Sequence, residues 1–74
     1  MIVDFMTAFD IGKAIAERRK NLQLTQAELA RLASCSKPTV IAAEQGKPTQ
    51  RTDKLLDILR VIGLTLTVTD ERRP

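Results

Sequence analysis

The chain has no histidine, tryptophan or tyrosine, and only one cysteine and two phenylalanines among its 74 residues. Without histidine it lacks the commonest general base and the commonest metal ligand, which argues against an enzyme and against a metal centre. The single thiol, Cys35, excludes a disulfide or a zinc cluster within one chain and fits a reducing compartment. We therefore expect no enzymatic activity, no cofactor and a cytoplasmic location.

Long apolar runs are absent as well. No stretch of about 18 apolar residues could span a membrane, and the start lacks a cationic region followed by a secretory apolar segment. With Phe5 and Phe9 as the only aromatics, the core must be aliphatic and thin, so self-association is a reasonable way to complete it. The net charge of +3 gives a mild bias towards polyanions. We expect one domain over residues 1–74.

Apolar residues recur at helical spacing from residue 7 to residue 63, the expected helical core. A capping box of Thr7 and Asp10 predicts a first helix over residues 8–21, within which Gly12 allows close packing. A second capping box, Thr25 and Glu28, begins the next helix. The inward positions of these two helices are expected to be Ile11, Ala14, Ile15, Leu22, Leu29, Leu32 and Ala33.

Two further helices follow. Ser36 is the expected cap of the third, with Pro38 in its first turn and Gly46 at its end. Thr52 is the expected cap of the fourth, and Gly63 its left-handed stop. The inward positions are expected to be Val40 and Ala43 in the third helix, and Leu55, Leu56, Leu59 and Ile62 in the fourth.

The segment Leu64–Val68 alternates apolar and β-branched polar residues with a period of two, which predicts a strand. One strand cannot satisfy its own backbone N–H and C=O groups, so it either lies in water or pairs outside the chain. The simplest partner is its copy in a second subunit, through Leu64, Leu66 and Val68. Residues 69–74 form a charged tail.

The second and third helices have helix-turn-helix spacing, with the small Ala30 where the helices would cross. An ordinary antiparallel helix pair has the same spacing, so spacing alone leaves DNA binding open.

The stretch "LTQAELARLASCSKPTVIAAEQGK" resembles the core of the XRE/Cro-type repressor family, and "TDKLLDILRVIGLTLTV" is similar to its short HipB-like subgroup. The resemblance implies an all-α, lambda-repressor-like domain of four to five helices, with one C-terminal strand pairing across a homodimer. It also implies a nucleoid-associated repressor that binds an inverted-repeat operator, and an antitoxin autorepressor with a HipA-like kinase toxin as partner.

Specific roles follow from the same resemblance. Thr25 and Gln26 would approach the phosphate backbone at a helix N-terminus, and Lys47 would form a second backbone clamp. Lys37 is the best base reader, although a phosphate contact or a solvated charge remains open. The groove-facing residues of the third helix would be Ser36, Lys37, Pro38, Thr39 and, by apolar contact, Ala42. Arg51 and Lys54 are weaker candidates.

The remaining expectations concern one ion pair and the positions at which this sequence departs from the family pattern. The resemblance also implies that Arg19 pairs with Glu44 and so orients the third helix, through a bidentate geometry that lysine could not reproduce. Ile41 and Ala42 stand where the family usually has polar residues, and Ser34 replaces the glycine of the turn. Fewer base contacts per subunit are therefore expected, with more reliance on dimer spacing and DNA shape. The alternative is a protein-binding module on the same scaffold, which neutralises a partner and binds DNA weakly or not at all.

Overall fold

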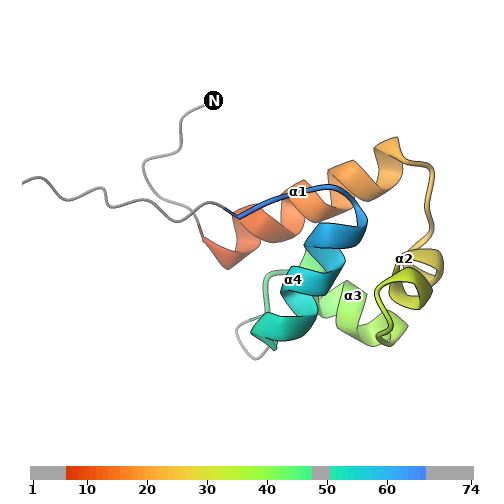
Figure 1. Ribbon diagram of the computed structural model, residues 1–74. Coiled ribbons are helices and arrows are strands. Elements are labelled where there is room, and N and C mark those ends of the chain that lie inside the picture. The colour runs from red at the N-terminus through yellow and green to blue at the C-terminus, as the bar shows by residue number, and fades with distance from the viewer. Residues whose placement is uncertain (1–6, 48–50, 67–74) are drawn as a thin grey trace, which may run out of the picture.

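The computed structural model describes residues 7–47 and 51–66, and four helices account for most of them. The helices are α1 (Ala8–Asn21), α2 (Gln26–Leu32), α3 (Lys37–Glu44) and α4 (Thr52–Val61), and none of the described residues is in a strand (Figure 1). α3 packs against each of the other three helices. The prediction of an all-α domain is confirmed for this part of the chain, as are the bounds of the first helix.

A side-chain hydrogen bond caps the N-terminus of three of the four helices. At α1, the Asp10 amide donates to the Thr7 hydroxyl (3.2 Å) and the Thr7 amide donates to the Asp10 carboxylate (2.9 Å). Thr25 and Glu28 form the same reciprocal pair at α2. Each box satisfies two backbone N–H groups that a helix would otherwise leave unpaired. Both predicted capping boxes are confirmed.

The predicted start of α4 is wrong by one residue. Thr52 is the first helical residue rather than the cap, and the Arg51 side chain at the cap position makes no hydrogen bond to the backbone N–H groups of the first turn. A residue inside the first turn cannot direct its hydroxyl at the free N–H groups that a cap satisfies. Arg51 instead pairs with the Asp53 carboxylate at 2.6 Å.

Each helix or its end contributes branched aliphatic side chains to one core. Ile15, Leu29, Val40 and Ile58, one from each helix, have no exposed surface. The buried set in the described part of the chain has no aromatic member, and Phe9 is 58% exposed, which confirms the aliphatic core. Fully burying one such side chain stabilises the fold by about 1.5–3 kcal/mol.

Four residues expected to face inward are exposed instead, namely Ala14, Leu22, Leu32 and Leu56. In α4 the buried stripe takes in Ile58 and Leu59, with Leu55 partly buried beside them. The i, i+3, i+4 spacing of these three positions places them on one helical face, and Leu56 projects about 100° away from Leu55. Leu22 follows the last residue of α1, and Leu32 is the last residue of α2. At both positions the backbone turns away from the core.

Gly12 sits where α1 crosses the carboxyl end of α3. A Cβ atom at this position would lie 2.6 Å from the carbonyl oxygen of Ala43, and closer still to that of Glu44. The predicted close packing at Gly12 is therefore confirmed. Gly46 and Gly63 follow the ends of α3 and α4 with φ of +69° and +76°, the left-handed conformation expected of helix-ending glycines.

The segment after α4 is described only as far as Leu66. The Leu64 amide donates to the Leu59 carbonyl (2.8 Å), and the Leu64 side chain packs against the core. Leu66 is 39% exposed. Val68 and the charged tail 69–74 lie outside the described residues, so the strand and its pairing across a dimer stay predictions. Among the residues described, no helix is long and apolar enough to cross a membrane.

Candidate nucleic-acid interface

A tight turn joins α2 to α3. Ala30 is buried on α2 with only 4% of its surface exposed, and its carbonyl accepts the Cys35 amide at 2.9 Å. Ser34, in the place of the expected glycine, has φ of +56°, a conformation that few residues other than glycine adopt readily. The Lys54 ammonium of α4 donates to the Ser34 carbonyl (3.2 Å). This bond ties the strained turn to α4.

α3 has an inner and an outer face. Val40 and Ala43 are buried, and they hold the helix on the core. Lys37 and Pro38 in the first turn are exposed, whereas Ile41 and Ala42 are half-buried. The outer face therefore begins with the charged Lys37 side chain at its N-terminal end and continues with the apolar side chains of Pro38, Ile41 and Ala42.

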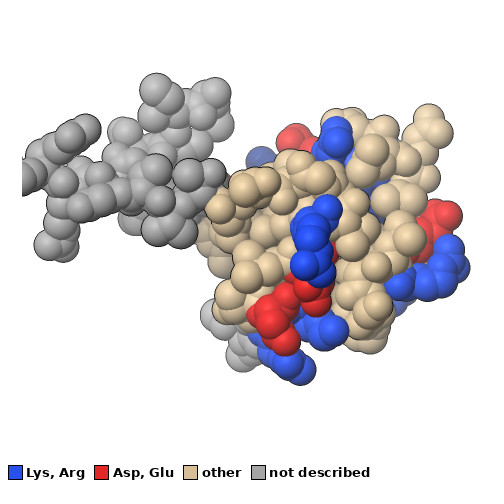
Figure 2. Space-filling model, viewed as in Figure 1, with Lys and Arg blue, Asp and Glu red and all other residues tan. Residues whose placement is uncertain are grey.

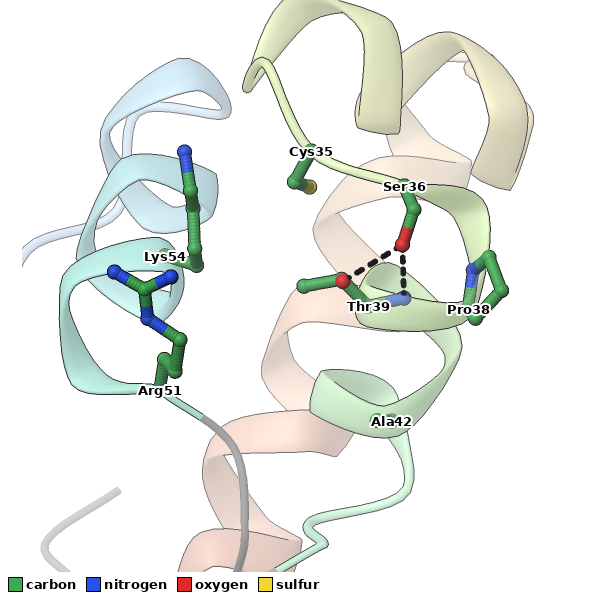
Figure 3. A pocket seen from close by; sticks show the side chains of 7 residues that line it. All are labelled: Cys35, Ser36, Pro38, Thr39, Ala42, Arg51 and Lys54. Carbon is green, nitrogen blue, oxygen red and sulfur yellow. Dashed lines mark hydrogen bonds between the residues drawn. The ribbon is translucent and has the colours of Figure 1, made fainter.

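A hollow of about 380 Å³ separates the outer face of α3 from the first turn of α4 (Figure 3). Arg51 and Lys54 line it on the α4 side, so the structure brings the two weaker sequence candidates next to the predicted reading helix. The α3 side and the turn before it contribute Cys35, Ser36, Pro38, Thr39 and Ala42. One wall is thus cationic, and the other is largely apolar.

Ser36 and Thr39 are linked twice at the start of α3. The Thr39 amide donates to the Ser36 hydroxyl (3.2 Å), which confirms Ser36 as the cap, and the two hydroxyl oxygens lie 2.8 Å apart (Figure 3). These bonds fix the rotamer of Thr39. Its hydroxyl turns to Ser36, and its methyl group turns towards the hollow (Figure 3).

An ion pair lies behind α3 and joins it to α1. Arg19 Nε donates to Glu44 Oε2 at 2.6 Å and Nη2 donates to Oε1 at 3.2 Å, while Nη1 reaches the Leu24 carbonyl at 3.0 Å. The two side chains are only 11% and 8% exposed. The paired geometry is the one implied by the family resemblance, and lysine could not reproduce it.

Gln26 belongs to the same network. Its Nε2 donates to Glu44 Oε1 at 3.1 Å, so Arg19, Glu44 and Gln26 connect α1, α3 and α2. The sequence reading placed Gln26 at the phosphate backbone and missed this bond. The TQ-x-x-LA pattern gives no sign of it, because the bond depends on how the carboxyl end of α3 lies against the start of α2.

Two other residues, Thr25 and Lys47, are predicted to contact the phosphate backbone of DNA. Thr25 is exposed at the N-terminus of α2, with its hydroxyl accepting the Glu28 amide. Lys47 is exposed after Gly46, but its backbone amide donates to the Ala42 carbonyl at 3.1 Å. Its side chain is therefore available for a phosphate, whereas its backbone N–H is already engaged.

Charges of both signs border this region. Lys54 lies 4.0 Å from Asp57, which also accepts a bond from Arg60 at 2.8 Å. Figure 2 accordingly shows blue and red side chains interleaved over α4 instead of one continuous basic patch. The first turn of α3 carries Lys37 and no acidic residue.

Two titratable groups near the helix-turn-helix unit are perturbed. The Thr25 backbone N–H, and then its hydroxyl, hold the pKa of the Glu28 carboxyl below its ordinary value. Burial raises the pKa of the Cys35 thiol by more than the nearby Lys54 ammonium lowers it. The thiol is therefore protonated at neutral pH and behaves as a small half-buried apolar group. Within the described ranges no three Asp, Glu, Cys or His side chains cluster as metal ligands.

Comparisons with known proteins also identify a helix-turn-helix domain in this chain. A family model described as "Helix-turn-helix domain" matches residues 10–72. An uncharacterized HTH-type transcriptional regulator, y4mF of Sinorhizobium fredii (strain NBRC 101917 / NGR234), is 34% identical over 62 residues, which are 84% of this chain and 82% of that protein. The chain therefore belongs to the helix-turn-helix family of DNA-binding regulators, and it is not an enzyme.

Solved structures specify the fold within this family. HipB in a complex with an O2 20mer superposes with a TM-score of 0.81 at 21% identity, covering 97% of this chain and 100% of that one. HipB in a HipA-HipB-O2-O3 complex gives 0.81 at 20% identity, with 96% and 100% covered. The clp gene regulator ClgR from C. glutamicum gives 0.69 at 19%, with 84% and 80% covered. The fold is that of the XRE-type regulator HipB.

Proposed function

We propose that the protein is a sequence-specific transcriptional repressor that inserts α3 into the major groove of DNA. The observation that carries this proposal is the position of the first turn of α3. Ser36, Lys37 and Pro38 are exposed there, with Arg51 and Lys54 across the hollow and the Arg19–Glu44 pair fixing the helix from behind. Rigid placement of a polar helix start beside cations is what groove entry requires.

Each predicted contact then has a role. Lys37 donates to guanine O6 and N7, and Thr25 with the side chain of Lys47 contacts phosphates on either side. Gln26 is assigned to positioning Glu44, because its amide nitrogen already donates to that carboxylate. Ser36 caps α3 and fixes the rotamer of Thr39.

The functional unit in this proposal is a homodimer on an inverted repeat whose half-sites lie about one helical turn apart. Leu64, Leu66 and Val68 pair across the two-fold axis as a two-stranded antiparallel ribbon. Support comes from the exposed leucines Leu56 and Leu66, which border one hollow beside the carboxyl half of α4. A single chain leaves these apolar side chains in water.

The likeness to HipB extends the proposal to a biological setting. One matched structure is a complex of HipB with an O2 20mer, and another also contains HipA. We assign this chain the role of an antitoxin that represses its own operon and binds a HipA-like kinase toxin. The identity to HipB is only about 21%, so this assignment must be tested on the residues of the present chain.

A second candidate function is a protein-binding module that neutralises a partner without reading DNA. The observation that favours it is the apolar middle of α3, where Ile41 and Ala42 replace hydrogen-bonding groups. Leu32, at the end of α2, is also 54% exposed. These side chains suit a protein surface as well as a DNA groove.

The two functions are separated by binding to the promoter region of the protein's own gene at 50 and 200 mM salt. If two cations per subunit contact phosphates, a dimer releases about four counterions, and affinity falls about 150-fold between these concentrations. Lys37→Ala should lower operator affinity by about 5- to 150-fold for each half-site, and Lys13→Ala is the matched control. Lys13 lies on α1 and packs over the Phe9 ring, away from the lining of the hollow. If the protein shows no operator-specific binding even at low salt, the protein-binding module remains as its function.

A further inference from the structure

The apolar wall of the hollow between α3 and α4 has a chemical specificity of its own. Three of its members contribute carbon, namely the Pro38 ring, the Thr39 methyl group and the Ala42 methyl group, while the Ser36 hydroxyl is engaged with Thr39. The Thr39 methyl group is held in place, because the hydroxyl on the same carbon is bonded to Ser36 at 2.8 Å. The surface is therefore preformed and does not depend on a rotamer chosen on binding.

In the major groove, one base-pair edge offers an apolar group. Thymine carries a 5-methyl group beside its O4 acceptor, and adenine, guanine and unmodified cytosine present only polar atoms and ring edges. A methyl-lined surface gains nothing from the hydrogen-bonding atoms of the other bases, and it desolvates them without compensation. Cations at the opposite wall, Arg51 and Lys54, complement the phosphates that flank such a base.

We propose that α3 reads the 5-methyl group of a pyrimidine, thymine in ordinary DNA, through Thr39 and Ala42 with Pro38 at the edge. This inference rests on the proposed DNA-binding function and specifies its ligand. Half-site recognition then has two parts. Lys37 supplies a polar contact at the N-terminal end of the helix, and the methyl-lined surface supplies an apolar contact that runs from Pro38 and Thr39 in the same turn to Ala42 further along α3.

The test is a uracil-interference experiment, which removes only the 5-methyl group. Duplexes of the promoter region are prepared with uracil replacing thymine at random, bound by the full-length protein at low salt, and cleaved at uracil in the bound and free fractions. Burial of one methyl group is worth about fourfold in affinity, and about fifteenfold when both half-sites lose it. We expect interference at symmetrically placed thymines, one or two in each half-site.

Variants assign the effect to the residues. Thr39→Ser keeps the hydroxyl, and with it the bonds to Ser36, but removes the methyl group; it should reduce the interference at one thymine position in each half-site. Ala42→Gly should do the same at a neighbouring position, with Ala16→Gly on α1 as the control for loss of helix propensity. In each variant the salt dependence of binding should stay unchanged, because no phosphate contact is altered.

The outcomes separate this inference from the function on which it rests. Operator-specific binding without interference at any thymine overturns the methyl reading and leaves the repressor function intact. Interference that is equal in the parent protein, Thr39→Ser and Ala42→Gly overturns the assignment to this surface. Failure of the parent protein to bind any promoter duplex at low salt refutes the DNA-binding function itself.

Discussion

Removal of Arg19 tests whether the ion pair behind α3 holds the reading helix in place. Arg19→Ala deletes both bonds to Glu44 and the bond to the Leu24 carbonyl, and it leaves the carboxylate with the Gln26 amide as its remaining partner. Both side chains of the pair are almost fully buried. Breaking a buried pair from one side costs about 3–5 kcal/mol, because the remaining charge stays without compensation.

That loss is large for a domain of this size. A chain of 74 residues has a folding stability of roughly 4–11 kcal/mol. Its unfolding entropy is about 0.16 kcal/mol per kelvin, so a loss of 3 kcal/mol lowers Tm by roughly 20 °C. A less stable parent protein would be largely unfolded at room temperature after the substitution.

The assay is thermal unfolding followed by far-ultraviolet circular dichroism, in parallel with operator binding. Arg60→Ala is the matched control, since Arg60 pairs with Asp57 at a similar distance but is 79% exposed. Exposed pairs contribute about 0–1 kcal/mol, and the control should shift Tm by no more than a few degrees. A Tm loss for Arg19→Ala no larger than that of the control refutes the orienting role. Loss of DNA binding with Tm preserved makes Arg19 a direct phosphate contact instead.

Three further predictions concern packing, assembly and pH. Gly12→Ala should lower Tm by more than 10 °C, because its methyl group collides with backbone carbonyls of α3. A Cβ atom at Gly63 would make only an ordinary contact with Arg18 Nη2 at 3.5 Å, so Gly63→Ala should cost about 1 kcal/mol of backbone strain; equal shifts for the two would contradict the close packing. Leu66→Asp should halve the mass measured by light scattering, and an unchanged mass removes the dimer model. The lowered pKa of Glu28 contributes stability that is fully present above about pH 4.5 and is lost as the pH falls through the lowered value. Urea unfolding between pH 6 and pH 2 should therefore show a shallower acid decline for Glu28→Gln, and an identical decline would refute this linkage.

Local signals made the helix starts predictable. A hydroxyl residue followed three positions later by a carboxylate specifies two backbone hydrogen bonds within one turn, so Thr7 and Thr25 could be assigned without knowledge of the fold. The same logic failed at Thr52. A lone threonine before an apolar stripe fits either the cap or the first helical position, and the choice depends on the path of the preceding chain.

Burial was harder to predict, because several apolar residues compete for one face. Leu56 and Ile58 are equally apolar in sequence, yet only Ile58 is buried, since its position completes the stripe that faces α2 and α3. The bond from Gln26 to Glu44 and the bond from Lys54 to Ser34 join residues 18 and 20 positions apart. Such bonds depend on how the helices cross, which periodicity does not encode.

The division of α3 into two faces bears on how this protein could diverge. Val40, Ala43 and Glu44 face the other helices, so changing them alters stability. Lys37 and Pro38 are exposed at the opposite side, and substitutions there leave the core untouched. If α3 reads DNA as proposed, a duplicated gene acquires a new DNA target through two or three outer substitutions without passing through an unfolded intermediate. Regulators with separate targets then arise from this scaffold in small steps.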